Sequence, residues 1–221
     1  MKQGYFKIIK NIPLARDVYE MTLEGDTSAI TAAGQFVNIK IDGLYLRRPI
    51  SVCDVDNNRL TIIYKVVGKG TRIMSELGVG VSLDILTGLG NGYNLEKSGD
   101  MPLLIGGGVG VPPLYNLAKR LIAQGKNVSV ILGFNTEAEI FYEKQFKALG
   151  CDVAVTTADG SCGVKGFVTD AMDKEYSYIY TCGPEPMLKD VYERCNRGGQ
   201  FSFEERMGCG FGACMGCRCK K

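Results

Sequence analysis

The pattern of the sequence changes near residue 100, and this change constrains the fold more than any other feature. Before it, five short segments alternate apolar and polar residues or are rich in β-branched residues, with Gly, Asp and Asn between them. They are residues 4–9, 17–23, 35–41, 60–67 and 81–86. Closely spaced strands of this kind predict a small antiparallel barrel. One helix is expected to interrupt the barrel at residues 71–77, with Thr71 as its N-cap.

After residue 100, strand patterns alternate with helix patterns. Strands are expected at residues 101–105, 127–134, 152–157 and 176–181, and helices at residues 112–124, 139–150, 167–172 and 184–194. This alternation predicts a parallel sheet that is covered by helices on both faces. The chain is therefore expected to divide into residues 1–97, residues 98–203 and a C-terminal segment of residues 204–221.

The composition narrows the function. The 221 residues have a net charge of +2 and no dense run of Lys or Arg, which argues against a nucleic-acid partner. No apolar stretch is long enough to span a bilayer, and the first residues lack the pattern of a secretory signal, so a cytoplasmic protein without a membrane partner is expected. The chain contains no histidine, which removes the commonest general base. Its chemistry is therefore expected to depend on cofactors.

Four of the nine cysteines lie close together at the end of the sequence. Cys209, Cys214 and Cys217 have the spacing C-x4-C-x2-C, which opens the plant-type [2Fe–2S] motif. The glycines around them permit the close backbone approach that a cluster loop requires. The alternative is a structural zinc site of four thiolates with Cys219 as the last ligand, although a C-x-C pair is a poorer match to zinc knuckles.

The fourth cluster ligand is the open question of this segment. Plant-type loops take their fourth cysteine from well beyond the third, but this sequence ends four residues after Cys217. Either Cys219 is the fourth ligand, or the sequence is a shortened form of a longer chain. We expect the second, and with it a cluster that is held incompletely.

A second motif lies in the segment LRRPIS at residues 46–51. Arg48 and Ser51 match the R-x-x-S flavin signature of the ferredoxin-reductase superfamily, in which the arginine holds the FAD pyrophosphate and the serine approaches flavin N5. A planar guanidinium suits a pyrophosphate, and the N–H groups at residues 68–71 would offer a phosphate site at a helix N-terminus. A solvated arginine pair is the alternative. The residues expected to bind FAD are Arg48, Pro49, Ile50, Ser51, Ile63, Tyr64, Lys65, Gly70 and Thr71, with Ser51 also a catalytic candidate.

Three further motifs follow strands of the predicted sheet. GGGVGVP at residues 106–112 resembles the GGGxGxxP phosphate loop of the same superfamily rather than the Rossmann G-x-G-x-x-G, and a glycine-rich turn without a ligand is the alternative. In that superfamily the segment CGPEPM, residues 182–187, lies beside the nicotinamide, where Cys182 is either a thiol near the hydride-transfer carbon or a structural cysteine. DGS, residues 159–161, matches a third loop. The residues expected to bind NAD are Gly106, Gly107, Gly108, Gly110, Asp159, Cys182, Gly183, Pro184 and Met187, with Cys182 also a catalytic candidate.

Together, these motifs cover nearly the whole chain in order. LRRPIS, GKGT, GGGVGVPP, TCGPEPM and EERMGCGFGACMGC resemble segments of the electron-transfer subunits of class 1B dihydroorotate dehydrogenases. The resemblance implies a six-stranded antiparallel FAD barrel, an α/β NAD-binding domain and a short [2Fe–2S] segment. It also implies electron transfer to or from an FMN-containing catalytic subunit that oxidises dihydroorotate in pyrimidine biosynthesis, in a heterotetramer of two plus two.

Two other functions stay open. One is a related flavin reductase subunit that serves ferredoxin, sulfide or a hydrogenase, and the other is a zinc-stabilised nucleotide-binding module without redox activity. The segment GFNTEAE at residues 133–139 is expected near the adenosine ribose of the bound nucleotide. It contains acidic residues and no Arg or Lys to hold a 2′-phosphate, so NADH is expected over NADPH.

Overall fold

The computed structural model describes residues 1–203, 207–210 and 212–214. These residues form two compact units. One contains residues 1–92 together with the described part of residues 207–214, and the other contains residues 93–203. The antiparallel barrel and the parallel sheet that the sequence predicts are both present.

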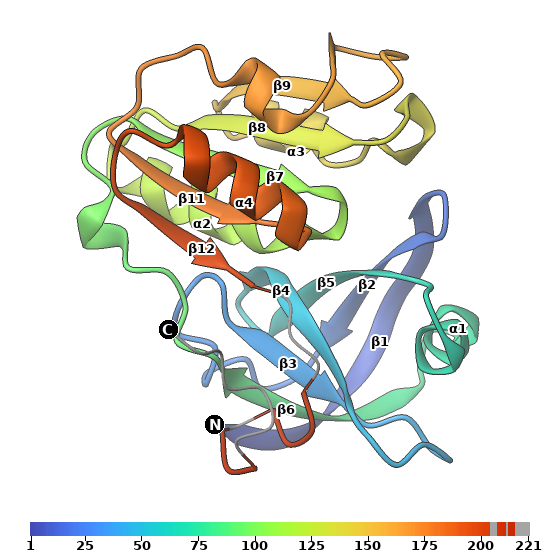
Figure 1. Cartoon of the computed structure of the whole chain (residues 1–221). Helices are drawn as coiled ribbons and strands as arrows, with labels where there is room; N and C mark the ends of the chain where they lie inside the picture. The colour runs from blue at the N-terminus through green and yellow to red at the C-terminus, as the bar shows by residue number, and fades with distance from the viewer. Residues whose placement is uncertain (204–206, 211, 215–221) are drawn as a thin grey trace. The chain divides into compact units, whose positions relative to one another are not determined.

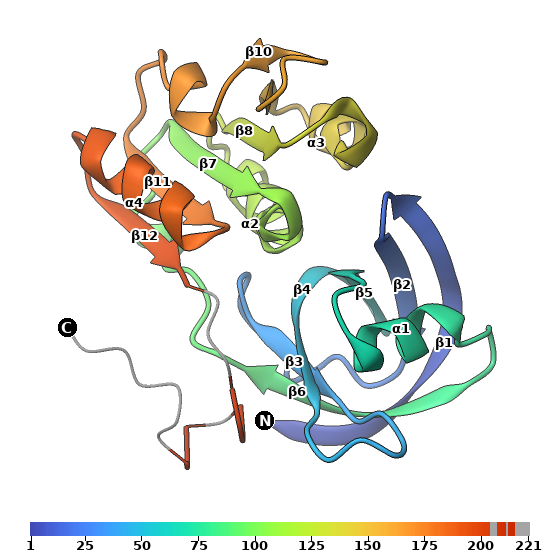
Figure 2. The same cartoon turned by 45° about the vertical axis from the view of Figure 1, so that its right-hand side comes forward.

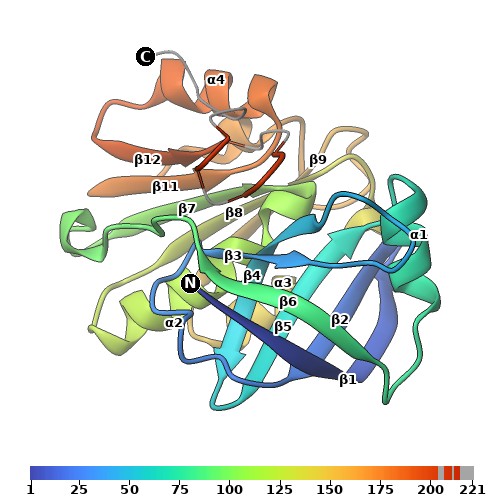
Figure 3. The ribbon, with the colours of Figure 1, turned by 90° about the horizontal axis from the view of Figure 1, so that it is seen from below.

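The first unit is a closed antiparallel barrel of six strands (Figure 1). In chain order the strands are β1 (Lys2–Ala15), β2 (Val18–Glu24), β3 (Phe36–Ile39), β4 (Arg48–Asp56), β5 (Arg59–Lys65) and β6 (Ser82–Leu89). Around the barrel they follow the order β1-β2-β5-β4-β3-β6, and β6 pairs with β1 to close it, as the view from below shows (Figure 3).

One helix, α1 (Lys69–Glu76), connects β5 to β6 beside the barrel (Figure 2). The helix begins after Gly68, so the prediction that Thr71 is its N-cap was wrong. Thr71 is the third helical residue, and its hydroxyl bonds back to the backbone that precedes the helix. At the other end of α1, the Asn11 side chain donates to the carbonyls of Met74 and Leu77, each at 2.9 Å. This amide caps the carbonyl end of α1, where Met74 O also accepts from the Leu77 amide.

The outer surface of strands β3 and β4 includes residues of the LRRPIS segment. Val37 and Ile39 of β3 and Val52 of β4 belong to the barrel core, and Ile50 packs against it. Because side chains alternate along a strand, the residues between them point to the outer face. We call this set the outer patch: it consists of Phe36, Asn38, Pro49 and Ser51.

The sequence did not single out β4 as a strand, and its proline is the reason. The register pairs Asn38 with Pro49 and Phe36 with Ser51. The Val52 amide donates to Gln35 O at 3.0 Å, so these two residues form a hydrogen-bonded pair. Such pairs alternate along an antiparallel ladder with non-hydrogen-bonded pairs, and the pair of Asn38 and Pro49 is one of the latter. Pro49 therefore lacks an N–H group at a position where the ladder between β3 and β4 requires none.

The second unit is a parallel sheet of six strands in the order β10-β9-β8-β7-β11-β12 (Figure 1). β7 and β11 lie side by side. From β7 the chain continues through β8 and β9 to β10 at one edge of the sheet, whereas from β11 it continues to β12 at the other edge. The carboxyl ends of two such strands form a crevice that binds ligands in open α/β sheets. The strands are β7 (Pro102–Gly107), β8 (Ser129–Phe134), β9 (Asp152–Thr157), β10 (Val164–Lys165), β11 (Tyr178–Cys182) and β12 (Gly199–Ser202).

Helices cover both faces of this sheet. α2 (Pro112–Ala123) and α3 (Glu143–Ala148) lie on one face, where Tyr115 packs edge-on against Phe146 with ring centroids 5.4 Å apart. The 3₁₀ turn η4 (Val168–Ala171) and α4 (Glu185–Arg194) cover the other face through Val168 and Val191. Among the described residues, none of these helices is long and apolar enough to cross a bilayer.

Three details of this unit differ from the prediction. The helix expected at residues 139–150 is confined to α3, because Tyr142 has a left-handed backbone (φ 66°) that α-helix does not allow. A separate 3₁₀ turn, η3 (Glu137–Glu139), precedes it. The short strands β10 and β12 were not predicted, and the helix expected at residues 167–172 is the 3₁₀ turn η4.

Candidate cofactor sites

Two of the three segments expected to bind FAD meet at the start of α1. Arg48 is the first residue of β4, and its side chain lies across Gly70 in the first turn of the helix. A Cβ at Gly70 would collide with Arg48 Nε, so glycine is the residue that allows this approach. Arg48 Nη1 donates to the backbone carbonyls of Leu46 and of Arg47, the second at 3.3 Å. A guanidinium is thereby held next to the N–H groups that open α1.

Thr71 shapes the turn before the helix. Its hydroxyl accepts hydrogen bonds from the amides of Val67 and Gly68, at 3.0 and 3.2 Å, and donates to Gly68 O at 3.1 Å. Thr71 is therefore occupied with the backbone rather than directed at a ligand. Because an α-helix gives its first N–H groups no intrahelical acceptor, the amides of Lys69 and Gly70 are the donors that an anion would meet here.

Arg47, the neighbour of Arg48, has a different role that the sequence analysis missed. It donates to Asn38 O at 3.3 Å and to Asp84 O at 3.0 Å, and it forms an ion pair with the Asp84 carboxylate at 2.9 Å. Burial acts to raise the pKa of Asp84, but hydrogen bonds from Arg47 and Gln3 outweigh it and hold that pKa below its ordinary value. Arg47 thus fixes the loop that carries Arg48, a role that the R-x-x-S spacing, which selects Arg48, does not reveal.

The other residues expected to bind FAD fall into two groups. Pro49 and Ser51 lie on the outer patch, whereas Ile50 packs against the barrel core. Tyr64 is also a core residue: it is 1% exposed, its ring stacks on Tyr19 and its hydroxyl donates to Asn11 Oδ1 at 3.0 Å. The side chain of Tyr64 cannot contact a ligand in this arrangement, so only its backbone remains for the expected role, whereas its neighbours Ile63 and Lys65 do not belong to the core cluster.

In the second unit, the glycine loop after β7 and the CGPEPM loop after β11 form one tight assembly. A Cβ at Gly107 would lie 2.5 Å from Met187 Sδ and 3.2 Å from Pro184 Cδ. A Cβ at Gly110 would collide with the carbonyl of Cys182 and come within 2.7 Å of the Gly183 Cα. The sheet register explains the contact, because Gly106 and Cys182 are paired at the ends of these two parallel strands.

The tip of the glycine loop is open. Gly108 has a left-handed backbone (φ 51°), and no atom lies within 4 Å of where its Cβ would be. The loop continues as a 3₁₀ turn, η2 (Gly108–Gly110), and leads directly into α2, whose first residues are Pro112 and Pro113. Prolines in the first turn lack N–H groups that the helix does not use. The loop and the helix start have the geometry of a phosphate-binding turn.

Cys182 lies half-buried at the carboxyl end of β11. The hydroxyl of Tyr93, a residue that the sequence analysis did not single out, donates to the neighbouring Thr181 O at 3.4 Å. Burial and the proximity of Cys182 raise the pKa of Tyr93 well above its ordinary value, so this hydroxyl stays neutral. The tyrosine thereby supports the end of the strand that leads into the CGPEPM loop.

The DGS loop after β9 is connected to the loop after β8. The Asp159 carboxylate accepts from the Ser161 amide at 2.9 Å and from its hydroxyl at 2.6 Å, and these bonds lower the pKa of Asp159. The Ser161 hydroxyl in turn accepts from the Glu137 amide at 2.7 Å. Glu139 is bound back to the Asn135 side chain at 3.0 Å. The two loops form one acidic rim at the carboxyl end of the sheet.

Two of the four expected cluster ligands, Cys209 and Cys214, are described, and Cys217 and Cys219 lie outside the described residues. The Cys214 amide donates to Cys209 Sγ at 3.5 Å, and a Cβ at Gly208 would lie 3.4 Å from Cys214 Sγ. A backbone N–H directed at a cysteine sulfur, and a glycine close to the second sulfur, fit a loop that wraps thiolates. Within the described residues, no group of three or more side chains is arranged to hold a metal ion.

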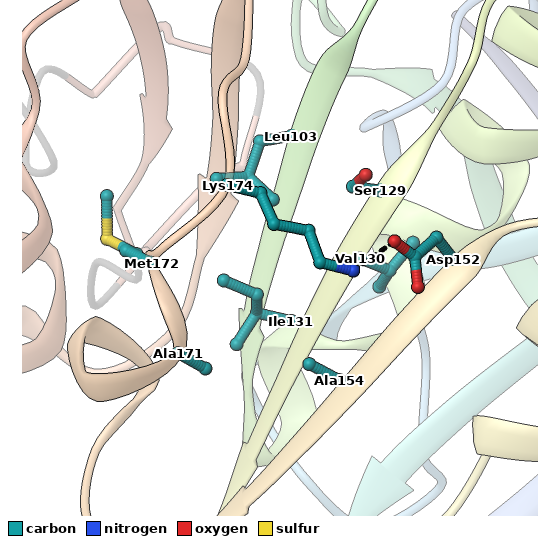
Figure 4. Close-up of a pocket in the computed structure, with 9 residues that line it drawn as sticks. All are labelled: Leu103, Ser129, Val130, Ile131, Asp152, Ala154, Ala171, Met172 and Lys174. Carbon is teal, nitrogen blue, oxygen red and sulfur yellow. Dashed lines mark hydrogen bonds and ion pairs between the residues drawn. The ribbon is translucent and has the colours of Figure 1, made fainter.

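A small pocket lies at the amino end of the parallel sheet, away from these loops. Figure 4 shows Lys174 reaching across it to an ion pair with Asp152, the first residue of β9. Its volume of about 20 Å³ has room for a water molecule and not for a nucleotide. This pocket is therefore not a cofactor site.

Known proteins resemble this chain over nearly its whole length. Residues 104–193 match the family model of the oxidoreductase NAD-binding domain. Dihydroorotate dehydrogenase B (NAD(+)) electron transfer subunits of Shouchella clausii and Fusobacterium nucleatum are each 45% identical to it. The alignments cover 99% and 96% of this chain, and 88% and 87% of those proteins. The solved structure of an NADH-dependent reduced ferredoxin-NADP oxidoreductase, studied for flavin-based electron bifurcation, is 31% identical with a TM-score of 0.87 and covers 97% of this chain and 82% of its own.

Proposed function

Because this chain belongs to the family of dihydroorotate dehydrogenase B electron transfer subunits, we propose that it passes electrons between NAD(H) and a catalytic subunit that oxidises dihydroorotate. The near-complete coverage of relatives at 45% identity carries this proposal. When bound, FAD accepts electrons in pairs and releases them singly, which lets a nicotinamide exchange electrons with a [2Fe–2S] cluster. The chain's own residues must bind these groups and orient them.

We assign the FAD pyrophosphate to Arg48 and to the backbone amides of Lys69 and Gly70. The guanidinium lies over a helix start, so a fixed charge and N–H donors converge on one point. Ser51, on the outer patch, is assigned to the flavin ring. Thr71, Ile50 and Tyr64 support this site through the backbone and the core.

We assign the NAD pyrophosphate to Gly107, Gly108 and Gly110, and the nicotinamide to the CGPEPM loop. The contacts between the two loops and the open tip at Gly108 support this assignment. Cys182 and Met187 would then lie next to the reacting ring. The acidic rim around Asp159 is assigned to the adenosine end.

We assign the [2Fe–2S] cluster to Cys209, Cys214, Cys217 and a fourth thiolate. Cys219 is the candidate that this sequence offers. For the domains, we propose that residues 1–97 bind FAD, that residues 98–203 bind NAD, and that residues 204–221 carry the cluster.

The assembly is proposed as two of these chains with two FMN-containing catalytic subunits. The proposed compartment is the cytoplasm. Its support is chemical, since Cys151, Cys162 and Cys195 are thiols and not disulfides, as expected in a reducing compartment.

The test is anaerobic purification followed by a visible spectrum and by assays of FAD, iron and acid-labile sulfide. One FAD per chain is expected with fewer than two irons, because we expect the cluster to be held incompletely, and this iron should be lost in Cys209→Ser and Cys214→Ser. Two irons per FAD in the unsubstituted protein that are lost in Cys219→Ser would identify Cys219 as the fourth ligand. A colourless protein that contains zinc would refute electron transfer and favour a nucleotide-binding module.

A further inference from the structure

Asn38 is a buried polar residue that none of the assignments above uses. It lies on β3 and is 2% exposed, although it belongs to the outer patch and not to the barrel core. Its partner across the ladder is Pro49, and the neighbouring pair joins Phe36 to Ser51. Both are non-hydrogen-bonded pairs, in which the side chains of an antiparallel ladder are closest. Asn38 is thus a direct neighbour of the strand that carries the flavin signature.

The loop that carries Cys209 and Gly210, which we call the cluster loop, covers Asn38. Asn38 Nδ2 donates to Cys209 O at 3.4 Å. The next residue, Gly210, has a left-handed backbone (φ 75°), and a Cβ on it would lie 2.7 Å from Asn38 Nδ2 and 3.7 Å from Phe36 Cε2. The loop therefore packs directly on the outer patch, with a glycine at the point of closest approach.

The stability of the barrel does not explain an asparagine at this position. Asn38 Oδ1 is buried and has no hydrogen-bond partner among the described residues. An unsatisfied buried acceptor costs about 1–3 kcal/mol, and an apolar side chain of the same size would avoid this cost. The amide must therefore serve something other than the fold, and the bond that it does make is to the first cluster cysteine.

We propose that Asn38 is a positioning residue for the cluster. Its amide fixes the carbonyl of Cys209 on the outer patch, and so orients the Cys209 thiolate toward the cluster at a set place relative to Ser51. Contacts then run without a gap from Ser51 and Pro49 of β4, through Phe36 and Asn38 of β3, to Cys209 and Gly210. This inference rests on the proposed function, because it requires a cluster on this loop.

The experiment compares three variants of the full chain, purified without oxygen. Asn38→Leu keeps the approximate size but removes the amide, and Asn38→Asp keeps the shape but removes the donor. Asn11→Asp is the matched control, because the Asn11 amide donates to the carbonyls of Met74 and Leu77 in the same barrel. Three quantities are measured: the rate of iron loss to a chelator per FAD, the electron paramagnetic resonance spectrum of the reduced protein, and the melting temperature of the apo-protein.

Both Asn38 variants are expected to lose iron about tenfold faster than the unsubstituted protein, the lower end of the effect of removing a residue that orients a metal ligand. Their resonance spectrum should change, while Asn38→Leu melts no lower than the unsubstituted protein. Asn11→Asp should melt lower and keep its iron. Iron loss and a spectrum in Asn38→Leu equal to those of the unsubstituted protein would overturn the inference alone. An unsubstituted protein that binds FAD and no iron would refute the cluster assignment, and this inference with it.

Discussion

Two adjacent arginines offer a sharp test of the flavin site, because the structure gives them separate functions. Arg48→Ala removes a charged hydrogen-bonding partner from the proposed pyrophosphate site, worth about 1.5–3 kcal/mol. Since each 1.4 kcal/mol is a factor of ten, the dissociation constant of FAD should rise roughly 10- to 150-fold. The stability of the apo-protein should change little, because the hydrogen bonds that Arg48 makes within the barrel are local. Their acceptors are the carbonyls of Leu46 and Arg47, directly before it in the chain.

Arg47→Ala should show the opposite pattern. The Arg47 and Asp84 side chains are 21% and 14% exposed, so the variant breaks a largely buried ion pair and two bonds to backbone carbonyls. A loss of about 2–3 kcal/mol is expected, which lowers the melting temperature by roughly 5–10 °C.

Fluorescence titration of apo-protein with FAD and calorimetric melting check the two values. Arg72→Ala, on the exposed side of α1, is the control for a general loss of positive charge and should alter neither. Equal flavin affinity in Arg48→Ala and the unsubstituted protein would refute the argument, and so would a flavin defect confined to Arg47→Ala.

Three further predictions concern the nucleotide unit and the acid stability of the barrel. Gly110→Ala should weaken NADH binding at least tenfold in titrations and leave the FAD content unchanged, because the added Cβ collides with the Cys182 carbonyl. The kcat/KM for NADH should exceed that for NADPH, since Glu137 and Glu139 lie at the acidic rim and would repel a 2′-phosphate; comparable values would contradict this assignment. Asp84 has a lowered folded-state pKa, so its contribution to stability is full above its unfolded pKa of about 3.9 and is lost as the pH falls through the folded value. The melting temperature should therefore fall less steeply from pH 4 to pH 2 in Asp84→Asn than in the unsubstituted protein.

Much of the architecture could be predicted from the sequence because it depends on local patterns. Alternating apolar residues marked five of the six barrel strands, and the change of pattern near residue 100 marked the parallel sheet. The GGGVGVP and CGPEPM loops were found because they follow strands directly and contain glycines and prolines, which are typical of tight turns. The start of α2 was found as well, because prolines in a first helical turn are distinctive.

What the sequence could not supply depends on contacts between distant residues. β4 contains a proline and two arginines at or near its start, and only its register against β3 shows that the proline breaks no ladder bond. Asn38 reads as one polar residue in an apolar strand until the loop 171 positions later is placed over it. The R-x-x-S spacing selects Arg48, but only the contacts of Arg47 with Asn38 O and Asp84 show what that arginine does. The left-handed Tyr142 that delays α3 has no local signal, because tyrosine rarely adopts that backbone.

The docking of the cluster loop on Asn38 also affects how the protein is made. The loop is synthesised 171 residues after the surface that receives it. Because the ribosome adds roughly 5–20 residues per second, that surface is synthesised about 10–30 seconds before the loop that covers it. During this interval the phenyl ring of Phe36 and the Asn38 amide are exposed to solvent and to other chains, while the second unit folds in between. Assembly of the iron site must then follow synthesis of the second unit, so a cell that is short of iron would accumulate chains whose barrel is complete and whose outer patch is still open.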